Sequence, residues 1–465
     1  LTVNDTTNTL TQKIIFGNEK KPQHEFHYRN LAEPVKSLDE ETMAFLKEAC
    51  PEMMAEPHGE AKSLLPYFPG YKFENGKSTY RGVEVTEGGE VYGEPGIYVD
   101  VALLDIASMH PHSAIAEVLF GVKYTKAFRE IVEGRVSIKH KAWDEVNHMF
   151  NGKLTPYIQL VIDGKMTAKQ LADALKTAIN SVYGLTFASF DNPFRDPRNK
   201  DNIVAKRGAL FMVDLLYAVQ EKGFKVAHIK TDSIKIPNAT PEIIQFVMDF
   251  GKRYGYTFEH EATYEKMCLV NNAVYIAKYK DGDWTATGTQ FQVPYVFKTL
   301  FSKKPIEFKD LCETKSVKTA MYLDFNEKLP EGEHNYRFVG KEGLFTPVKP
   351  GSGGGLLVRE ATDKNGNIKY DSVTGASGYR WMESEIVKNL GRDVIDKGYY
   401  EVLVNEAIDT IKKYGDFEWF ASDDKEPPVK NEPVPDFMNI PELPDGVDGV
   451  PFDEYDEIIK EKNNG

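Results

Sequence analysis

The chain has 465 residues, of which 41% are hydrophobic and 28% are charged, a composition typical of a globular protein with two to four subdomains. Its longest apolar run, residues 209–213, is stopped by Asp214, which excludes a membrane-spanning segment. The three cysteines lie far apart and form no C-x-x-C pair, which excludes a zinc knuckle and a disulfide framework and favours a reducing cytoplasm.

The net charge of −14 argues at first against a nucleic-acid partner, for which a basic surface is expected. The charge is unevenly distributed, however. Residues 421–465 carry 13 acidic and four basic side chains, a net charge of −9, which leaves −5 on the other 420 residues. The global charge is therefore a weak argument, and we expect residues 421–465 to form a loosely ordered acidic, proline-rich tail.

The N-terminal region, residues 1–95, carries no strong motif. The chain starts at Leu1 with no initiator methionine or signal peptide, from which we expect a trimmed or split product. Ser37 and Glu40 are spaced as a capping box at the start of a helix. Residues 66–96 are rich in Gly, Tyr and Phe, which predicts short strands and turns.

Residues 97–104 predict a strand buried on both faces near the middle of a sheet, because residues 101–104 are continuously apolar. The strand ends at Asp105, and Pro111 prevents regular pairing just beyond it.

Three helices are expected next. Residues 123–152 predict a helix with many cationic side chains. A second helix begins at a capping box made by Thr167 and Gln170 and stops at Gly184. A third covers residues 202–222 and ends at Gly223. Further on we expect a helix over residues 241–254, a strand over 269–279 and helices over 382–414.

The stretch 226–236 predicts a β-hairpin, since apolar and polar residues alternate on either side of the turn formers Thr231, Asp232 and Ser233. An aspartate at the tip of such a hairpin is lifted clear of the sheet. Taken alone, it would be interpreted as an ordinary exposed turn residue.

The second helix has one polar face. Lys176, Asn180 and Tyr183 fall within roughly 60° of one another at 100° per residue, and the apolar residues lie on the other side. An amphipathic helix with solvated polar residues is the ordinary interpretation.

Two carboxylates on neighbouring strands, such as Asp105 and Asp232, would repel each other unless a cation lay between them. A pair of Mg²⁺ ions about 4 Å apart, held by such carboxylates, is the usual device for phosphoryl transfer.

Taken together, these residues resemble a known family. Asp105-x-x-Ser108-x-x-Pro111, Lys176-x-x-x-Asn180-Ser181-x-Tyr183-Gly184 and Thr231-Asp232-Ser233 look like motifs A, B and C of family B DNA polymerases, in the correct order and spacing. The rest of the chain is similar to the polymerases of tailed bacterial viruses, without the exonuclease domain.

The resemblance implies roles for individual residues. Asp105 and Asp232 would be catalytic and would bind two Mg²⁺ ions, for which Mn²⁺ can substitute, with help from the Ile106 carbonyl. The implied nucleotide-binding residues are Ser108, Met109, His110, Lys139, Lys176, Asn180 and Tyr183. Arg135 and Lys141 are alternatives to Lys139. The implied DNA-binding residues are Gly184, Thr231, Tyr275 and Lys278.

Four departures from the family pattern stand out. Lys230 occupies a position where the family usually has an acidic residue, and His110 replaces the tyrosine that excludes ribose. The family's primer-contact lysine is missing at Asn272 or Ala273, although Lys278 or Lys280 could compensate. About 95 residues precede the first strand, too few for an exonuclease domain, so we expect proofreading from a removed segment or a separate chain.

We therefore expect an α+β fold of the right-hand polymerase type, with an antiparallel palm sheet, a two-helix fingers hairpin and a mixed thumb. The expected parts are an N-terminal region (1–95), palm (96–122 and 181–300), fingers (123–180), thumb (301–420) and tail (421–465). The expected partners are primer–template DNA, dNTPs and a replication accessory protein or exonuclease chain, with no membrane. The expected location is the cytoplasm of an infected bacterium. The alternatives are a catalytically impaired nucleic-acid-binding scaffold and a two-metal nuclease.

Overall fold

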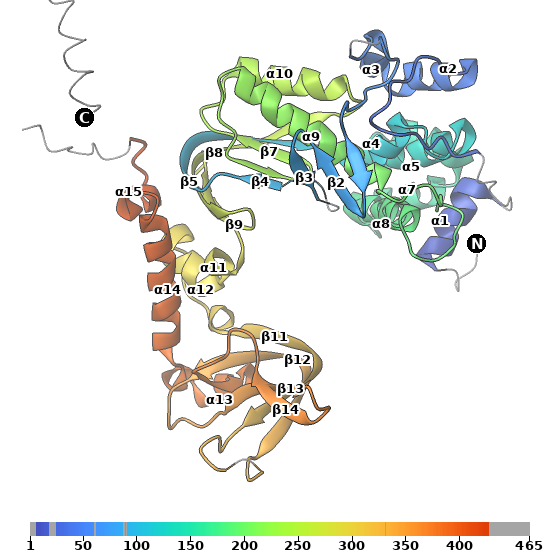
Figure 1. Ribbon diagram of the computed structural model, residues 1–465. Helices are drawn as coiled ribbons and strands as arrows, with labels where there is room; N and C mark the ends of the chain where they lie inside the picture. The colour runs from blue at the N-terminus through green and yellow to red at the C-terminus, as the bar shows by residue number, and fades with distance from the viewer. Residues whose placement is uncertain are drawn as a thin grey trace, which may run out of the picture. The chain divides into compact units, whose positions relative to one another are not determined.

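A computed structural model describes residues 6–17, 25–59, 62–86, 89, 91–330 and 332–426 (Figure 1). The described residues up to Asp423 form one compact unit, and a second unit begins at Asp424. The expected acidic tail lies outside the described residues from residue 427 onward.

The N-terminal region contains three helices, α1 (Thr7–Phe16), α2 (Glu40–Ala49) and α3 (Pro51–Ala55), and a small antiparallel sheet of β1 (Lys72–Glu74), β2 (Lys77–Tyr80) and β3 (Val83–Val85). The predicted capping box at the start of α2 is wrong. Asp39 is the N-cap, and its Oδ1 accepts a hydrogen bond of 2.8 Å from the backbone N–H of Thr42. A carboxylate one residue before the helix satisfies the free amide that a serine at position 37 cannot reach.

The central element is a seven-stranded sheet in the order β10-β9-β8-β5-β7-β6-β4, in which every pair is antiparallel. This confirms the predicted antiparallel sheet and the central place of the first long strand. The strands are β4 (Val91–Gly93), β5 (Gly96–Ile106), β6 (His228–Lys230), β7 (Ser233–Ile236), β8 (Phe258–Asn271), β9 (Val274–Tyr279) and β10 (Trp284–Thr287).

The single strand predicted over residues 269–279 is instead the end of β8, a turn and β9. The carboxamide Oδ1 of Asn271 accepts a 2.8 Å hydrogen bond from the N–H of Ala273. A turn closed by an asparagine side chain reverses the chain without glycine or proline. The residues around it are typical of strands, so the sequence predicted no turn here.

Helices cover one face of the central sheet. The helices α4 (Met109–Ala116), α9 (Ile203–Glu221) and α10 (Pro241–Lys252) pack on it (Figure 1). The core between them includes Leu104, Ile106, Ile229, Ile234 and Ile236. On the opposite face, a smaller apolar cluster is drawn from the strands and from Ala227 beside them, and it includes Val101, Leu103, Tyr264, Met267 and Tyr275. The sheet therefore has one face covered by helices and one more open face.

The region between α4 and α9 differs from the two-helix hairpin expected. The helices α5 (Val122–Lys139) and α8 (Ala168–Thr186) are separated by α6 (Trp143–His148), a 3₁₀ turn (Met149–Gly152) and α7 (Thr155–Ile162). The helix predicted over residues 123–152 is broken because Lys141 has a left-handed backbone, φ 57°, and so do Phe150 and Asn151. The capping box of Thr167 and Gln170 is confirmed, although α8 continues two residues past Gly184.

The C-terminal part holds a five-stranded antiparallel sheet in the order β14-β13-β11-β12-β15. The strands are β11 (Glu313–Asp324), β12 (Tyr336–Val348), β13 (Leu356–Thr362), β14 (Ile368–Ser372) and β15 (Arg380–Glu383). The associated helices are α11 (Thr289–Gln292), α12 (Pro294–Phe297), α13 (Ser384–Leu390), α14 (Lys397–Lys412) and α15 (Phe417–Ala421). The helices predicted over residues 382–414 are thus two, interrupted at Gly391, where φ is 95°.

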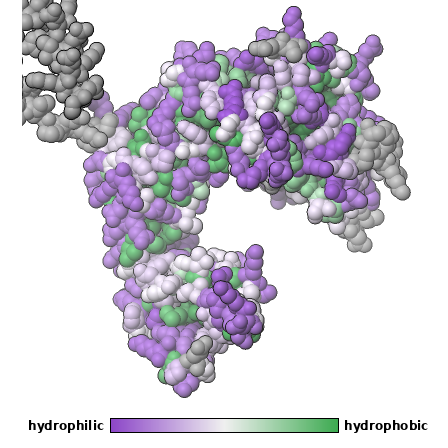
Figure 2. Space-filling model, viewed as in Figure 1, coloured by the Kyte–Doolittle hydropathy of each residue, from purple (hydrophilic) through white to green (hydrophobic). Residues whose placement is uncertain are grey.

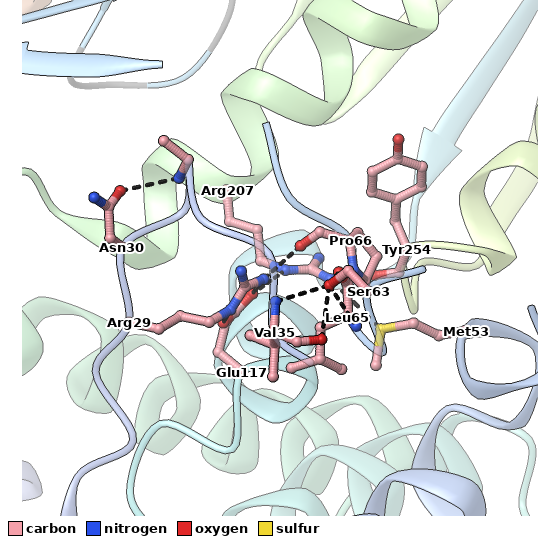
Figure 3. Close-up of polar contacts among 11 residues, drawn as sticks. Arg29, Asn30, Val35, Met53, Ser63, Leu65, Pro66, Glu117, Arg207 and Tyr254 are labelled. Carbon is pink, nitrogen blue, oxygen red and sulfur yellow. Dashed lines mark hydrogen bonds and ion pairs between the residues drawn. The ribbon is translucent and has the colours of Figure 1, made fainter. Parts of the chain in front are cut away.

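A buried ion-pair cluster ties the N-terminal segment to the helices behind the sheet (Figure 3). The Glu117 side chain is 2% exposed and accepts hydrogen bonds from Arg29 Nη2 and Arg207 Nε, both at 2.8 Å. The same two arginines also donate to backbone carbonyls. Arg29 Nη2 donates to the carbonyl of Pro66 at 2.5 Å, and Arg207 Nη2 donates to that of Tyr254 at 2.7 Å. One carboxylate therefore joins three segments that are distant in sequence.

The visible surface is mostly hydrophilic, with apolar side chains in small scattered patches (Figure 2). Among the described helices, none is both long enough and apolar enough to cross a bilayer.

Candidate active site

The hairpin of β6 and β7 presents Asp232 at its tip. Lys230 pairs with Ser233, so the turn contains only Thr231 and Asp232, and Ser233 belongs to the strand rather than to the turn. Thr231 has φ 55°, the left-handed conformation that two-residue hairpin turns require. A β-branched residue rarely adopts this conformation, so the tight turn holds the Asp232 backbone in one place.

Asp105 and Asp232 lie side by side. The backbone N–H of Ile106 donates a 2.8 Å hydrogen bond to the Asp232 carbonyl, and Asp105 pairs in register with Ser233. On its other side Asp105 pairs with Glu259 of β8. The end of the central strand and the tip of the hairpin thus bring two carboxylates together, as the motifs lead one to expect.

The electrostatics of this pair are unfavourable without a cation. The pKa of Asp105 is raised to about 7, first by burial and then by the charges of Asp232, Glu261 and Glu259. Burial also raises the pKa of Asp232. A divalent cation would remove the repulsion and let both carboxylates ionise.

The donor set fits Mg²⁺ better than a transition metal. Among the residues that the structure describes, no group of three or more His, Cys, Asp or Glu side chains is arranged to hold a metal ion. Mg²⁺ is usually bound by only one or two protein carboxylates and completes its octahedron with water and substrate phosphate. The neighbouring carboxylates of Asp105 and Asp232 are ligands of this kind.

The start of α4 follows directly from Asp105. Ser108 is the N-cap, with a left-handed backbone (φ 54°, ψ 56°), and it accepts the N–H of His112 at 3.1 Å. The Met109 side chain is buried against α9, where a Cβ added at Gly208 would lie 2.7 Å from the Met109 Sδ. The unpaired amides at this helix start carry partial positive charge close to the two carboxylates.

His110 connects α4 to α8. Its ring stacks on Tyr183, with centroids 4.5 Å apart and an interplanar angle of 11°. Burial lowers the pKa of His110, only partly opposed by Asp232, so the imidazole is neutral at pH 7. Its buried Nδ1 has no hydrogen-bond partner among the described residues.

The polar face of α8 is arranged as predicted. Lys176 and Asn180 are exposed, whereas the opposite face, including Leu171 and Val182, is buried. Tyr183, the third residue of the predicted polar face, is half-buried and packs against the core. On α5, Lys139 lies in the last turn and is exposed, as is Lys141 just beyond the helix, and Arg135 is half-buried.

A functional candidate that the sequence analysis missed is Lys235. Its ammonium donates to His228 Nδ1 at 3.1 Å and lies 5.0 Å from the centroid of the Tyr275 ring. Burial lowers the pKa of Lys235 to about 8, with Lys230 contributing and the carboxylates of Asp105 and Asp232 opposing the shift. The alternation from Ser233 to Ile236 places Lys235 on the same face as Ser233, but nothing in the local sequence signals that its side chain is buried.

Lys278 does not join this site. Its Nζ is buried, donates to Asp423 Oδ1 at 2.6 Å and lies 3.5 Å from Glu265 Oε1. The expected primer contact by Lys278 therefore does not fit the structure, since a strand turns residues three apart to opposite faces and Tyr275 faces the other way. Lys280 forms an exposed ion pair of 3.0 Å with Asp100.

Comparisons with known proteins give limited information. No protein-family model matches the chain, and no curated protein sequence matches it. One similar solved structure is the family B DNA polymerase from the hyperthermophilic archaeon Pyrobaculum calidifontis, with 14% identity and a TM-score of 0.38. The match covers 76% of this chain and 48% of that one, so the chain spans about half the length of the polymerase. A likeness of this size establishes no family, and any assignment has to rest on the site itself.

Proposed function

We propose that this chain is a DNA-templated DNA polymerase that adds dNTPs to the 3′ end of a primer. The observation that carries the proposal is the pairing of Asp105 and Asp232 at the end of the central strand, beside the start of α4, whose His110 stacks on Tyr183 of α8. The substrate class follows from the motif resemblance. A role in viral replication inside a bacterial host is a prediction from the same resemblance.

In the proposed reaction, the primer 3′-hydroxyl oxygen attacks the α-phosphorus of the dNTP, and the bond to pyrophosphate breaks. Two Mg²⁺ ions held by Asp105 and Asp232 would lower the pKa of the attacking hydroxyl and neutralise the leaving phosphates. The protein contributes mostly by positioning and by charge. Its carboxylates fix where the reaction takes place, and the tight turn at Thr231 limits their movement.

The remaining site residues orient the nucleotide. Amides at Ser108 and Met109 and the ammonium of Lys176 would bind the triphosphate, because an N-terminal helix end and a lysine both favour phosphate oxygens. Asn180 would help to close that site. His110 and Tyr183, stacked on each other, would form the wall against the sugar and base.

In this proposal the seven-stranded sheet with its helices is the palm, α5 to α8 the fingers and the five-stranded sheet with α13 and α14 the thumb. Tyr275 and Gly184 would contact the DNA, as would the backbone at Thr231.

A primer-extension assay with Mg²⁺ and dNTPs tests the proposal. We expect templated extension that falls by three orders of magnitude or more in Asp232→Ala, without loss of thermal stability. Asp281→Asn, in an exposed turn of the same sheet, is the matched control and should extend normally. Binding of DNA without extension would favour a scaffold, and primer shortening would favour a nuclease.

A further inference from the structure

Lys235 is a buried lysine on the more open face of the central sheet. Register places it there, since β7 pairs Ser233 with Asp105 and Lys235 with Leu103 on β5. Residues two apart on a strand share a face, so Lys235 and Asp105 project from the same side. Lys235 is only 3% exposed.

A histidine fixes the ammonium. His228 Nε2 lies 3.1 Å from the carbonyl oxygen of Asn272, and a carbonyl can only accept, so Nε2 carries the proton. His228 Nδ1 is then an acceptor, and it receives the hydrogen bond of 3.1 Å from Lys235 Nζ. Burial, reinforced by Lys235, lowers the pKa of His228 to about 4, which keeps this imidazole neutral.

The ring of Tyr275 lies beside the same ammonium. The distance from Lys235 Nζ to the ring centroid is 5.0 Å, and the His228 ring meets Tyr275 edge-on at 5.9 Å. Three strands, β6, β7 and β9, therefore build one arrangement around a single positive charge.

The hydrogen bonding of Lys235 is incomplete in comparison with another buried lysine of this sheet. Lys266 donates to two carbonyls, those of Trp419 at 2.7 Å and Ser422 at 3.0 Å, and it lies 4.6 Å from the Trp419 ring. Among the described residues, the hydrogen bond found for the Lys235 ammonium is the one to neutral His228. An ammonium has three donors, and burying it without anionic acceptors is unfavourable. Asp105 and Asp232 act on the charge of Lys235 without a described hydrogen bond to it, so the ammonium keeps donor capacity for a further anion.

The position of Lys235 along β7 indicates which anion could bind its ammonium. Lys235 lies two residues beyond Ser233, about 7 Å from the level of Asp105 at the usual rise per residue. It lies on the side of Asp105 away from Ser108 and Met109, where the nucleotide triphosphate is expected. The other polyanion that must reach Asp105 is the primer strand.

We propose that Lys235, held by His228 beside Tyr275, is a positioning residue whose charge holds the terminal phosphate of the primer strand next to Asp105. This inference rests on the proposed polymerase function and goes beyond it by assigning the cation on the primer side of the site.

The test compares Lys235→Met and Lys235→Arg in the full chain. Lys266→Met is the burial-matched control on the opposite sheet face, and Lys252→Met, at the end of α10, is a second, exposed control. Binding of a fluorescent primer–template is measured by anisotropy without metal over a range of salt concentrations. Steady-state extension then gives KM for primer–template and KM for dNTP separately.

We expect Lys235→Met to raise the primer–template Kd and KM tenfold or more, with the dNTP KM within twofold. The slope of log Kd against log salt should fall by about one, the change for one lost phosphate contact. Lys235→Arg should restore at least part of the binding, and the folded controls should match the unaltered protein.

An unchanged primer–template Kd, or an effect confined to the dNTP KM, would refute the role of Lys235. If Lys235→Met does not fold, the polar but uncharged Lys235→Gln replaces it, and normal primer affinity in folded Lys235→Gln would refute the role equally. Failure of the unaltered protein to extend primers would instead refute the polymerase function, which keeps the two results distinguishable.

Discussion

The imidazole of His110 and the phenol ring of Tyr183 stack with centroids 4.5 Å apart and planes within 11° of parallel. The contact joins the first turn of α4, next to the two aspartates, to the polar face of α8. Stacking also fixes the orientation of His110, because its Nδ1 is buried and has no described partner that could hold the ring otherwise. This pair is the part of the site that best suits contact with the sugar of an incoming nucleotide.

Replacing His110 with tyrosine is expected to increase selection of dNTPs over rNTPs by tenfold or more, equivalent to about 1.4 kcal/mol. A phenol extends further than an imidazole and would occupy the space that a 2′-hydroxyl needs. The measurement is the ratio of kcat/KM for a dNTP and its matching rNTP.

His110→Gln, which has no ring, is the companion variant for this test. It should leave selection as low as in the unaltered protein or lower it. If His110→Tyr and His110→Gln both keep the original ratio, the sugar is discriminated elsewhere in the site.

The helices and strands that are predicted correctly are those marked by residues close together in the sequence. The capping box of Thr167 and Gln170 starts α8 as expected, and the alternation over residues 226–236 gives the hairpin. The break in the helix predicted over residues 123–152 has no such signal, since Lys141 adopts a positive φ without being glycine. Only packing against neighbouring helices can impose that conformation, and a single sequence does not show it.

The same distinction applies to the site. Asp105 and Asp232 are found from motifs, whereas Lys235 looks like any lysine in a strand. Its burial depends on Tyr275, which arrives from a strand forty residues later and is invisible to local patterns. Lys278 is a different case, because the two-residue period alone indicates that it faces away from Tyr275.

Asp105 should be a source of instability in the metal-free protein. Its pKa is raised to about 7 by burial and by the charge of Asp232, so the folded state favours the neutral carboxyl. A raised carboxyl pKa means that ionisation costs stability as the pH rises from about 4 through 7. Asp105→Asn is therefore expected to stabilise the metal-free protein by about 1–3 kcal/mol at pH 8 and by little at pH 4.

Chemical denaturation in the presence of a chelator at both pH values measures this difference. Asp281→Asn should have the same free energy of unfolding as the unaltered protein at either pH, since Asp281 is exposed. Mg²⁺ should stabilise the unaltered protein more than Asp105→Asn, because the variant lacks one of the charged ligands. Equal stability of the variant and the unaltered protein at pH 8 would contradict the raised pKa.

The contribution of Glu117 to the stability of the fold depends on pH in the opposite sense to that of Asp105. Burial alone would raise its pKa, but Arg29 and Arg207 hold the pKa below its ordinary value. A lowered carboxyl pKa contributes stability that is present above the ordinary pKa of about 4.3 and is lost as the pH falls through the folded value. Acid should therefore weaken the link between the N-terminal segment and α9.

Glu117→Gln is expected to cost about 3–5 kcal/mol at pH 7, because it leaves Arg207, with a side chain 0% exposed, without its counter-charge. The difference from the unaltered protein should begin to shrink below the ordinary pKa of about 4.3, where the glutamate of the unfolded chain takes up a proton, and it should shrink further as the pH falls towards the lowered pKa of the folded state. Glu48→Gln is the matched control, since Glu48 pairs with Arg129 while 68% exposed and should contribute less than 1 kcal/mol. Urea unfolding at pH 7 and at pH 3.5 measures the loss of unfolding free energy in Glu117→Gln and in Glu48→Gln. Equal losses in the two variants would show that the buried cluster contributes no more than a surface ion pair.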